Sequence, residues 1–189
     1  TVDVVEDVAI SQGYARFEPV MPSQFTVGGL SRLEQMADRV RHLMVGMEFQ
    51  EIISNIMGSH QDFCTRMRLD GTEWAQVVEV DNVMSLSYSC LRQWITPSLL
   101  QVETNSSRAF YPHRMFEVGE VAVPDASADI GSRTVTKLGA VIAHAGAHFS
   151  EIHSCLDLLL YYLDQPFTLE PVPHPSFLDG RAGAIVAGG

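Results

Sequence analysis

Three carboxylates lie close together near the start of the chain, in the stretch TVDVVEDVAISQGY. Asp3, Glu6 and Asp7 are three and four residues apart, so a helix here would carry all three on one face. Carboxylates in the first turn of a helix complement its macrodipole, and the spacing alone favours this interpretation. The alternative is a hard cation such as Mg²⁺, which is held by one or two carboxylates together with water and partner groups.

Three arginines are candidates for binding an anion. Arg92, Arg108 and Arg114 flank a predicted helix that begins near Pro97, and arginine binds phosphate or carboxylate groups through paired hydrogen bonds. Ion pairs with the carboxylates of this acidic chain explain the same arginines, and we favour that interpretation. A rival hypothesis places Arg92, Arg114 and Glu117 in a central cleft that binds an amino acid or a nucleotide.

The histidines and possible nucleophiles carry weaker signals. His144, His148 and His153 are spaced by four and five residues, but no fourth ligand is evident, so capping and surface positions are favoured over zinc. Ser150 precedes His153 by three residues without the GxSxG turn that exposes a catalytic serine. Cys90 has no glycine-rich turn beside it, which favours a structural thiol. The sequence contains neither GxGxxG nor a P-loop.

The composition excludes several classes of protein. The 189 residues carry a net charge of −11, which argues against binding nucleic acid through the overall field, although a local basic patch stays possible. Hydrophobic residues make up 46%, enough for a core. Three cysteines without a CxxC motif favour a reducing cytoplasm, and no apolar run approaches the roughly 20 residues of a membrane span. Both ends look abrupt, so we expect a segment of a longer chain.

Hydrophobic periodicity and turn residues predict the elements that position these side chains. The expected helices are residues 3–14, 31–47, 59–67, 96–107 and 148–163. The expected strands are residues 49–57, 74–80, 114–124 with a bend or bulge at 118–120, 137–145, 167–172 and 182–188. We expect a junction helix over 1–14 from a preceding domain, a linker over 15–30 and a core over 31–189 that is truncated at its C-terminus. The order indicates an α+β fold with mostly antiparallel strands.

Six segments in this order resemble the phenylalanyl-tRNA synthetase β subunit family, in its archaeal and eukaryotic form. They are DVVEDVAISQGYARFEP, GGLSRLEQMADRVRHLMVGMEFQEI, LRQWITPSLLQVETNSS, YPHRMFEVGEV, HFSEIHSCLDLLL and HPSFLDGRAGAI. The resemblance implies a class II aminoacyl-tRNA synthetase-like antiparallel sheet flanked by helices. It also implies a module without catalysis, because Glu120 stands where active cores carry a basic residue and no GxGxxER motif is present. The helix and strand over residues 31–53 correspond to the family's dimer-interface motif.

The resemblance also implies partners and a metal. The family is a heterotetramer of two α and two β subunits in the cytoplasm, in which the α subunit uses ATP to attach phenylalanine to tRNA. Asp3, Glu6 and Asp7 match Mg²⁺ ligands that the family shares with the α subunit. We therefore expect a non-catalytic assembly module. The alternatives are a free-standing enzyme or a nucleotide- or small-molecule-binding module that uses the class II-like cleft, and a module that contacts tRNA.

Overall fold

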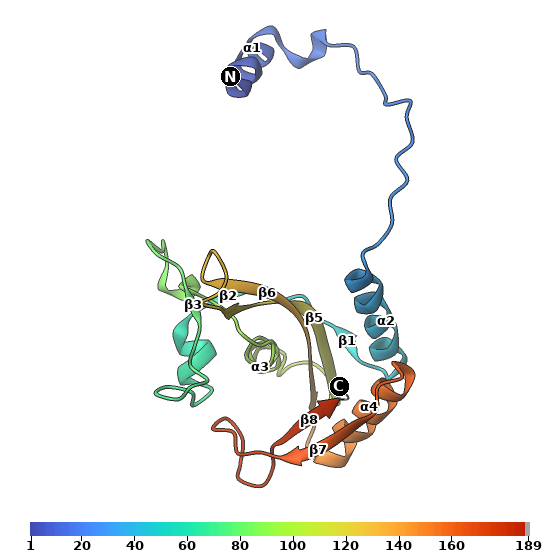
Figure 1. The fold of residues 1–189 in the computed structure, drawn as a ribbon, viewed down its shortest axis with the longest axis vertical. Helices are drawn as coiled ribbons and strands as arrows, with labels where there is room; N and C mark the ends of the chain where they lie inside the picture. The colour runs from blue at the N-terminus through green and yellow to red at the C-terminus, as the bar shows by residue number, and fades with distance from the viewer. Residues whose placement is uncertain (188–189) are drawn as a thin grey trace. The chain divides into compact units, whose positions relative to one another are not determined.

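The computed structural model describes residues 1–187, and the chain divides into two units, Thr1–Ser31 and Arg32–Gly189 (Figure 1). The first unit contains the helix α1 (Val2–Gln12) and the 3-10 turn η1 (Tyr14–Arg16). Gly13 ends α1 with a φ of 82°, a conformation that favours glycine, so the predicted helix and its glycine terminator are confirmed. None of the residues of α1 is buried within the unit.

The second unit is built around a sheet of three strands in the order β1-β5-β6. β5 (His113–Pro124) and β6 (Ser132–Ala143) pair antiparallel without interruption, from His113 opposite Ala143 to Pro124 opposite Ser132. β1 (Gln50–Glu51) pairs with β5 in parallel. The expected bend at residues 118–120 is wrong, because Gly119 keeps its place in the ladder opposite Lys137.

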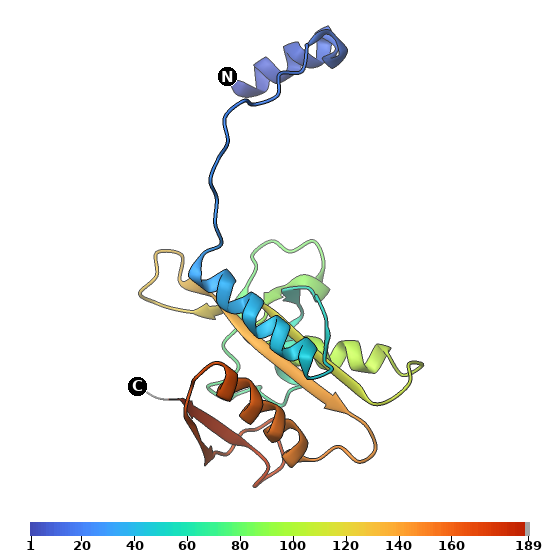
Figure 2. The same cartoon turned by 90° about the vertical axis from the view of Figure 1, so that its right-hand side faces the viewer.

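Helices cover both faces of this sheet. Figure 2 shows α2 (Arg32–Gly46) and α4 (Phe149–Tyr162) on the same side of the long strands, and α3 (Thr96–Asn105) lies on the other side. Successive side chains of β5 point to opposite faces of the sheet, as strand geometry requires. Phe116 packs with residues of α2 and α4, and Met115 packs with residues of α3. The apolar residues of these two clusters recur at the spacing expected for the buried face of a helix or of a strand.

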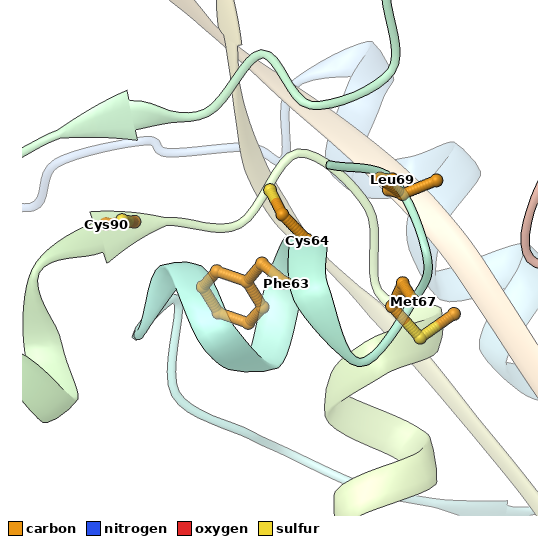
Figure 3. Close-up of a cluster of buried hydrophobic side chains, with 5 residues drawn as sticks. All are labelled: Phe63, Cys64, Met67, Leu69 and Cys90. Atoms are coloured by element: carbon orange, nitrogen blue, oxygen red, sulfur yellow. The ribbon is translucent and has the colours of Figure 1, made fainter. Parts of the chain in front are cut away.

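A smaller sheet and two short helical turns form the remaining part near α3. The sheet has the order β2-β4-β3, with β2 (Met57–Gly58), β4 (Cys90–Leu91) and β3 (Val78–Glu79). The turns are η2 (Gln61–Thr65) and η3 (Leu86–Tyr88). Figure 3 shows the cluster that they bury, which consists of Phe63, Cys64, Met67, Leu69 and Cys90. Burial raises the pKa of the Cys64 thiol to about 11, which makes this cysteine a structural, unreactive group.

Two predicted strands are much shorter than expected, and the strand predicted over 137–145 begins earlier, at Ser132, and ends at Ala143. The stretches 49–57 and 74–80 contain only the two-residue strands β1, β2 and β3, because each pairs only briefly with its neighbour before the chain turns away. The hairpin of β7 (Phe167–Pro171) and β8 (Gly183–Ala187) confirms the last two strands, apart from residue 188, which lies outside the described residues. Within residues 1–187, no helix has the length and apolar character to cross a membrane.

Gly139 sets the distance between α3 and β6, and its replacement tests this packing. A Cβ at Gly139 would lie 2.8 Å from Cβ of Ile95, an atom fixed to the backbone. We expect Gly139→Ala to lower the free energy of unfolding by about 1–3 kcal/mol through overpacking, measured by urea denaturation. Gly46→Ala is the matched control, because nothing lies within 4 Å of its added Cβ. Equal stability of the two variants would show that α3 is free to move away from β6.

Candidate functional site

The acidic residues of the first unit lie on one exposed helix. Asp3 lies in the first turn of α1, where it complements the helix dipole, while Glu6 and Asp7 lie beyond that turn. Throughout the described part of the chain, no three His, Cys, Asp or Glu side chains are arranged to hold a metal ion. The three carboxylates therefore do not form a coordination set by themselves.

The second unit contains a buried ion pair beneath its central sheet. Arg92 follows β4, and Glu117 lies in β5 on the face that carries α3. Their side chains are 1% and 5% exposed. Nη2 of Arg92 donates to Oε1 of Glu117 at 2.6 Å, and Nη1 donates to Oε2 at 3.1 Å. This bidentate geometry is the strongest form of an arginine–carboxylate contact.

The remaining polar atoms of the pair are also bonded. Nε of Arg92 donates to the backbone carbonyl of Glu120 at 3.0 Å, and Nη1 donates to Oγ of Ser54 at 2.7 Å. Ser54 in turn donates its hydroxyl proton to Oε2 of Glu117 at 2.5 Å. Gly119 makes room for this arrangement, since a Cβ there would lie 2.5 Å from Nη2 of Arg92. The guanidinium is thus neutralised and enclosed.

The rival cleft of Arg92, Arg114 and Glu117 is not formed. Residues 114 and 117 are three apart in the strand β5, so their side chains point to opposite faces of the sheet. Arg92 and Glu117 lie on the α3 face, whereas Arg114 contacts Glu151 of α4. That hypothesis is wrong because the alternation of side chains along β5 sends Arg114 and Glu117 to opposite faces of the sheet, where each pairs with a different partner.

Arg114 belongs to a second network on the opposite face. Its Nη2 donates to Oε1 of Glu151 at 2.8 Å, and its guanidinium lies 5.9 Å from the ring centre of Phe49. His144 contacts Oε2 of the same carboxylate through Nε2 at 2.8 Å. The hydrogen bond from His144, and next that from Arg114, lowers the pKa of Glu151. The network joins β5, the end of β6 and the first turn of α4.

The other candidate side chains have separate roles. His144 pairs with Glu151, while His153 lies 3.2 Å from Asp157 one turn along α4, so these histidines do not converge. Cys90 is buried in the cluster of Figure 3, as expected for a structural thiol, and Arg108 lies exposed after α3. Sequence reasoning missed Glu151 and Ser54, because their partners are 37 and 38 residues away and no local spacing links them.

A cavity of about 890 Å³ lies between α3, β6, the start of α4 and the β7–β8 hairpin. Its lining includes Leu100, Val141, Ile152 and Leu169. The charged residues of its lining are Glu170 and Arg181. The buried pair Arg92–Glu117 is not part of this lining. This cavity is therefore predominantly apolar, and its lining lacks a cluster of cations suited to a triphosphate.

Comparisons with known proteins agree with this architecture. The chain is 40% identical over 188 residues to the phenylalanine–tRNA ligase β subunit of Borrelia garinii, and 38% identical over 188 residues to that of Treponema pallidum. Both matches cover 100% of this chain but only 33% and 31% of the relatives, so the chain spans about a third of their length. These relatives are bacterial, which corrects the expected archaeal or eukaryotic form.

A solved structure shows the same fold at low identity. The structure of Desulfitobacterium hafniense PylSc, a pyrrolysyl tRNA synthetase, matches with a TM-score of 0.55 and 14% identity, over 75% of this chain and 50% of that one. The family model described as the phenylalanyl tRNA synthetase beta chain CLM domain matches residues 18–189. The relatives and the family model lead to one conclusion: the chain belongs to the phenylalanyl-tRNA synthetase β chain family.

Proposed function

We propose that this chain is a non-catalytic, class II synthetase-like part of a phenylalanyl-tRNA synthetase β subunit, and that it supports assembly with the α subunit. In this proposal the α subunit uses ATP and attaches phenylalanine to tRNA, within a heterotetramer of two α and two β subunits. The observation that carries the proposal is the enclosed pair Arg92–Glu117. A guanidinium that already holds a carboxylate in a bidentate contact has no charge left for a nucleotide phosphate.

The helix α2 supports the assembly role because its apolar residues divide between two sides. Met44 is 3% exposed and packs with Phe116, as expected for the side that faces the sheet. Leu33 and Met36, three residues apart, are 55% and 47% exposed. An outward pair of this kind fits an interface with another chain better than contact with water. We assign this side of α2 to the α subunit.

In this proposal, Mg²⁺ and tRNA are bound by the complex as a whole and not by this chain alone. Asp3, Glu6 and Asp7 would supply part of a Mg²⁺ site, with the remaining oxygen ligands coming from the α subunit. The net charge of −11 favours contacts between tRNA and other parts of the complex over contacts with this chain.

Copurification with the α subunit tests the assembly role. We expect the double variant Leu33→Asp/Met36→Asp to bind the α subunit at least about tenfold more weakly, a loss of about 1.4 kcal/mol or more. Ile130→Asp is the control, because this residue is 81% exposed in the turn between β5 and β6. Urea denaturation of each variant shows whether the fold is intact. Unchanged binding by a folded double variant would remove α2 from the interface.

The stability of Arg92 variants tests whether the buried pair is structural. Arg92→Met leaves the carboxylate of Glu117 buried without its partner, so we expect the free energy of unfolding to fall by about 3–5 kcal/mol. Arg92→Met/Glu117→Leu removes both charges, and we expect it to recover a large part of that loss. Urea denaturation measures both changes. An Arg92→Met variant as stable as the wild-type chain would contradict a structural role for the pair.

A further inference from the structure

One histidine outside the networks described above lies within a group of aromatic rings. His174 belongs to the loop of residues 172–182 between β7 and β8, called the β7–β8 loop below. Its ring centre lies 5.0 Å from that of Trp74, 5.6 Å from that of Trp94 and 5.0 Å from that of Phe177. Trp74 and Trp94 come from segments far away in the sequence, so His174 joins the loop to the region around the smaller sheet.

Two hydrogen bonds complete this attachment. The hydroxyl of Ser176 donates to the backbone carbonyl of Met67 at 2.5 Å, which fixes the loop to the cluster of Figure 3. The backbone N–H of Ser176 donates to Nδ1 of His174 at 3.2 Å. Nδ1 accepts the hydrogen bond in this contact, so it must itself be unprotonated when the loop is attached. Protonation of Nδ1 would place two donors against each other.

The surroundings of His174 do not compensate a positive charge. Burial lowers the pKa of His174 and is the only cause of the shift. The charged residues close to these contacts in the sequence are Glu73, which precedes Trp74, and Asp179 and Arg181 of the loop. None of these charges contributes to the shift in the pKa of His174. Within the described residues, His174 takes part in no ion pair. The tryptophan faces attract a cation, but the Nδ1 proton would still cost the Ser176 bond.

The attached loop forms one wall of the cavity of about 890 Å³. Ser176, Phe177, Gly180 and Arg181 of the loop line it, together with Met67, whose carbonyl receives the Ser176 hydroxyl. Release of the loop would therefore remove this wall of the cavity.

We propose that His174 is a proton-sensitive anchor, which holds the β7–β8 loop over the cavity when neutral and releases it when protonated. A histidine with a lowered pKa stabilises the attached state above its ordinary pKa of about 6.5, and this stabilisation is lost as the pH falls through the lower value of the attached state. The loop is thus attached at neutral pH and released in mild acid. This inference is independent of the role in assembly, because it concerns only contacts within the chain.

The protein contains its own probe for this change. The chain has two tryptophans, and both contact His174, so their fluorescence reports directly on the anchor. We expect the tryptophan emission of the 189-residue chain to shift to longer wavelength between about pH 7.5 and about pH 5, with a midpoint below about 6.5. Over the same range, the backbone N–H of Ser176 should lose its protection from hydrogen exchange. Far-UV circular dichroism separates loop release from global unfolding.

His174→Phe is the variant that decides the question, because it keeps an aromatic ring in the cluster but removes the titrating group. We expect this variant to lose the pH-dependent emission shift. His60→Gln is the control, since His60 is 45% exposed, lies 3.8 Å from Asp70 and is not the histidine whose ring contacts the tryptophans, so this variant should keep the shift. A shift that persists in His174→Phe would overturn the proposal. So would wild-type emission and Ser176 exchange that do not change while the chain stays folded.

Discussion

The contact between Arg92 and Glu117 is the constraint on which the rest of the second unit depends. It is the one place where a full charge pair is enclosed beneath the sheet among the residues that the structure describes, with side chains 1% and 5% exposed. Such a pair persists only when its partners stay in place, since removal of either leaves an uncompensated buried charge. Arg92, which follows β4, also donates to the backbone carbonyl of Glu120 in β5 and to Oγ of Ser98 at the start of α3, so these elements are held around the pair. Gly119 leaves room for the guanidinium without interrupting the β5–β6 ladder.

The same pair is the main support for the proposed role in assembly rather than in catalysis. The guanidinium of Arg92 beneath the sheet is paired with the carboxylate of Glu117, and the cavity nearby is predominantly apolar. The Arg114–Glu151–His144 network on the other face likewise pairs its cation with an internal carboxylate. These two arginines therefore join elements of the fold to one another. In our proposal the α subunit binds the outward side of α2, where Leu33 and Met36 are exposed.

The sequence correctly predicted those features of the helices that depend on residues close to one another along the chain. Pro97 lies in the first turn of α3, Gly13 ends α1, and the apolar stripe of α4 was visible from its spacing. The strands over 49–57 and 74–80 could not be predicted in length, because β1 and β3 each pair with a neighbour over only two residues, and the sequence does not show where such pairing ends. The pairing of Arg92 with Glu117 joins residues 25 apart in the sequence, and that of Arg114 with Glu151 joins residues 37 apart. Only the tertiary fold brings these side chains together.

The central claim is that this chain adopts the fold of a synthetase without doing its chemistry. The most direct measurement is the phenylalanine-dependent exchange of pyrophosphate into ATP, catalysed by the purified 189-residue chain with and without the α subunit. The account predicts no exchange by this chain alone, and exchange only in samples that contain the α subunit. Exchange by the chain alone, abolished by Arg92→Met in a sample that remains folded, would contradict it.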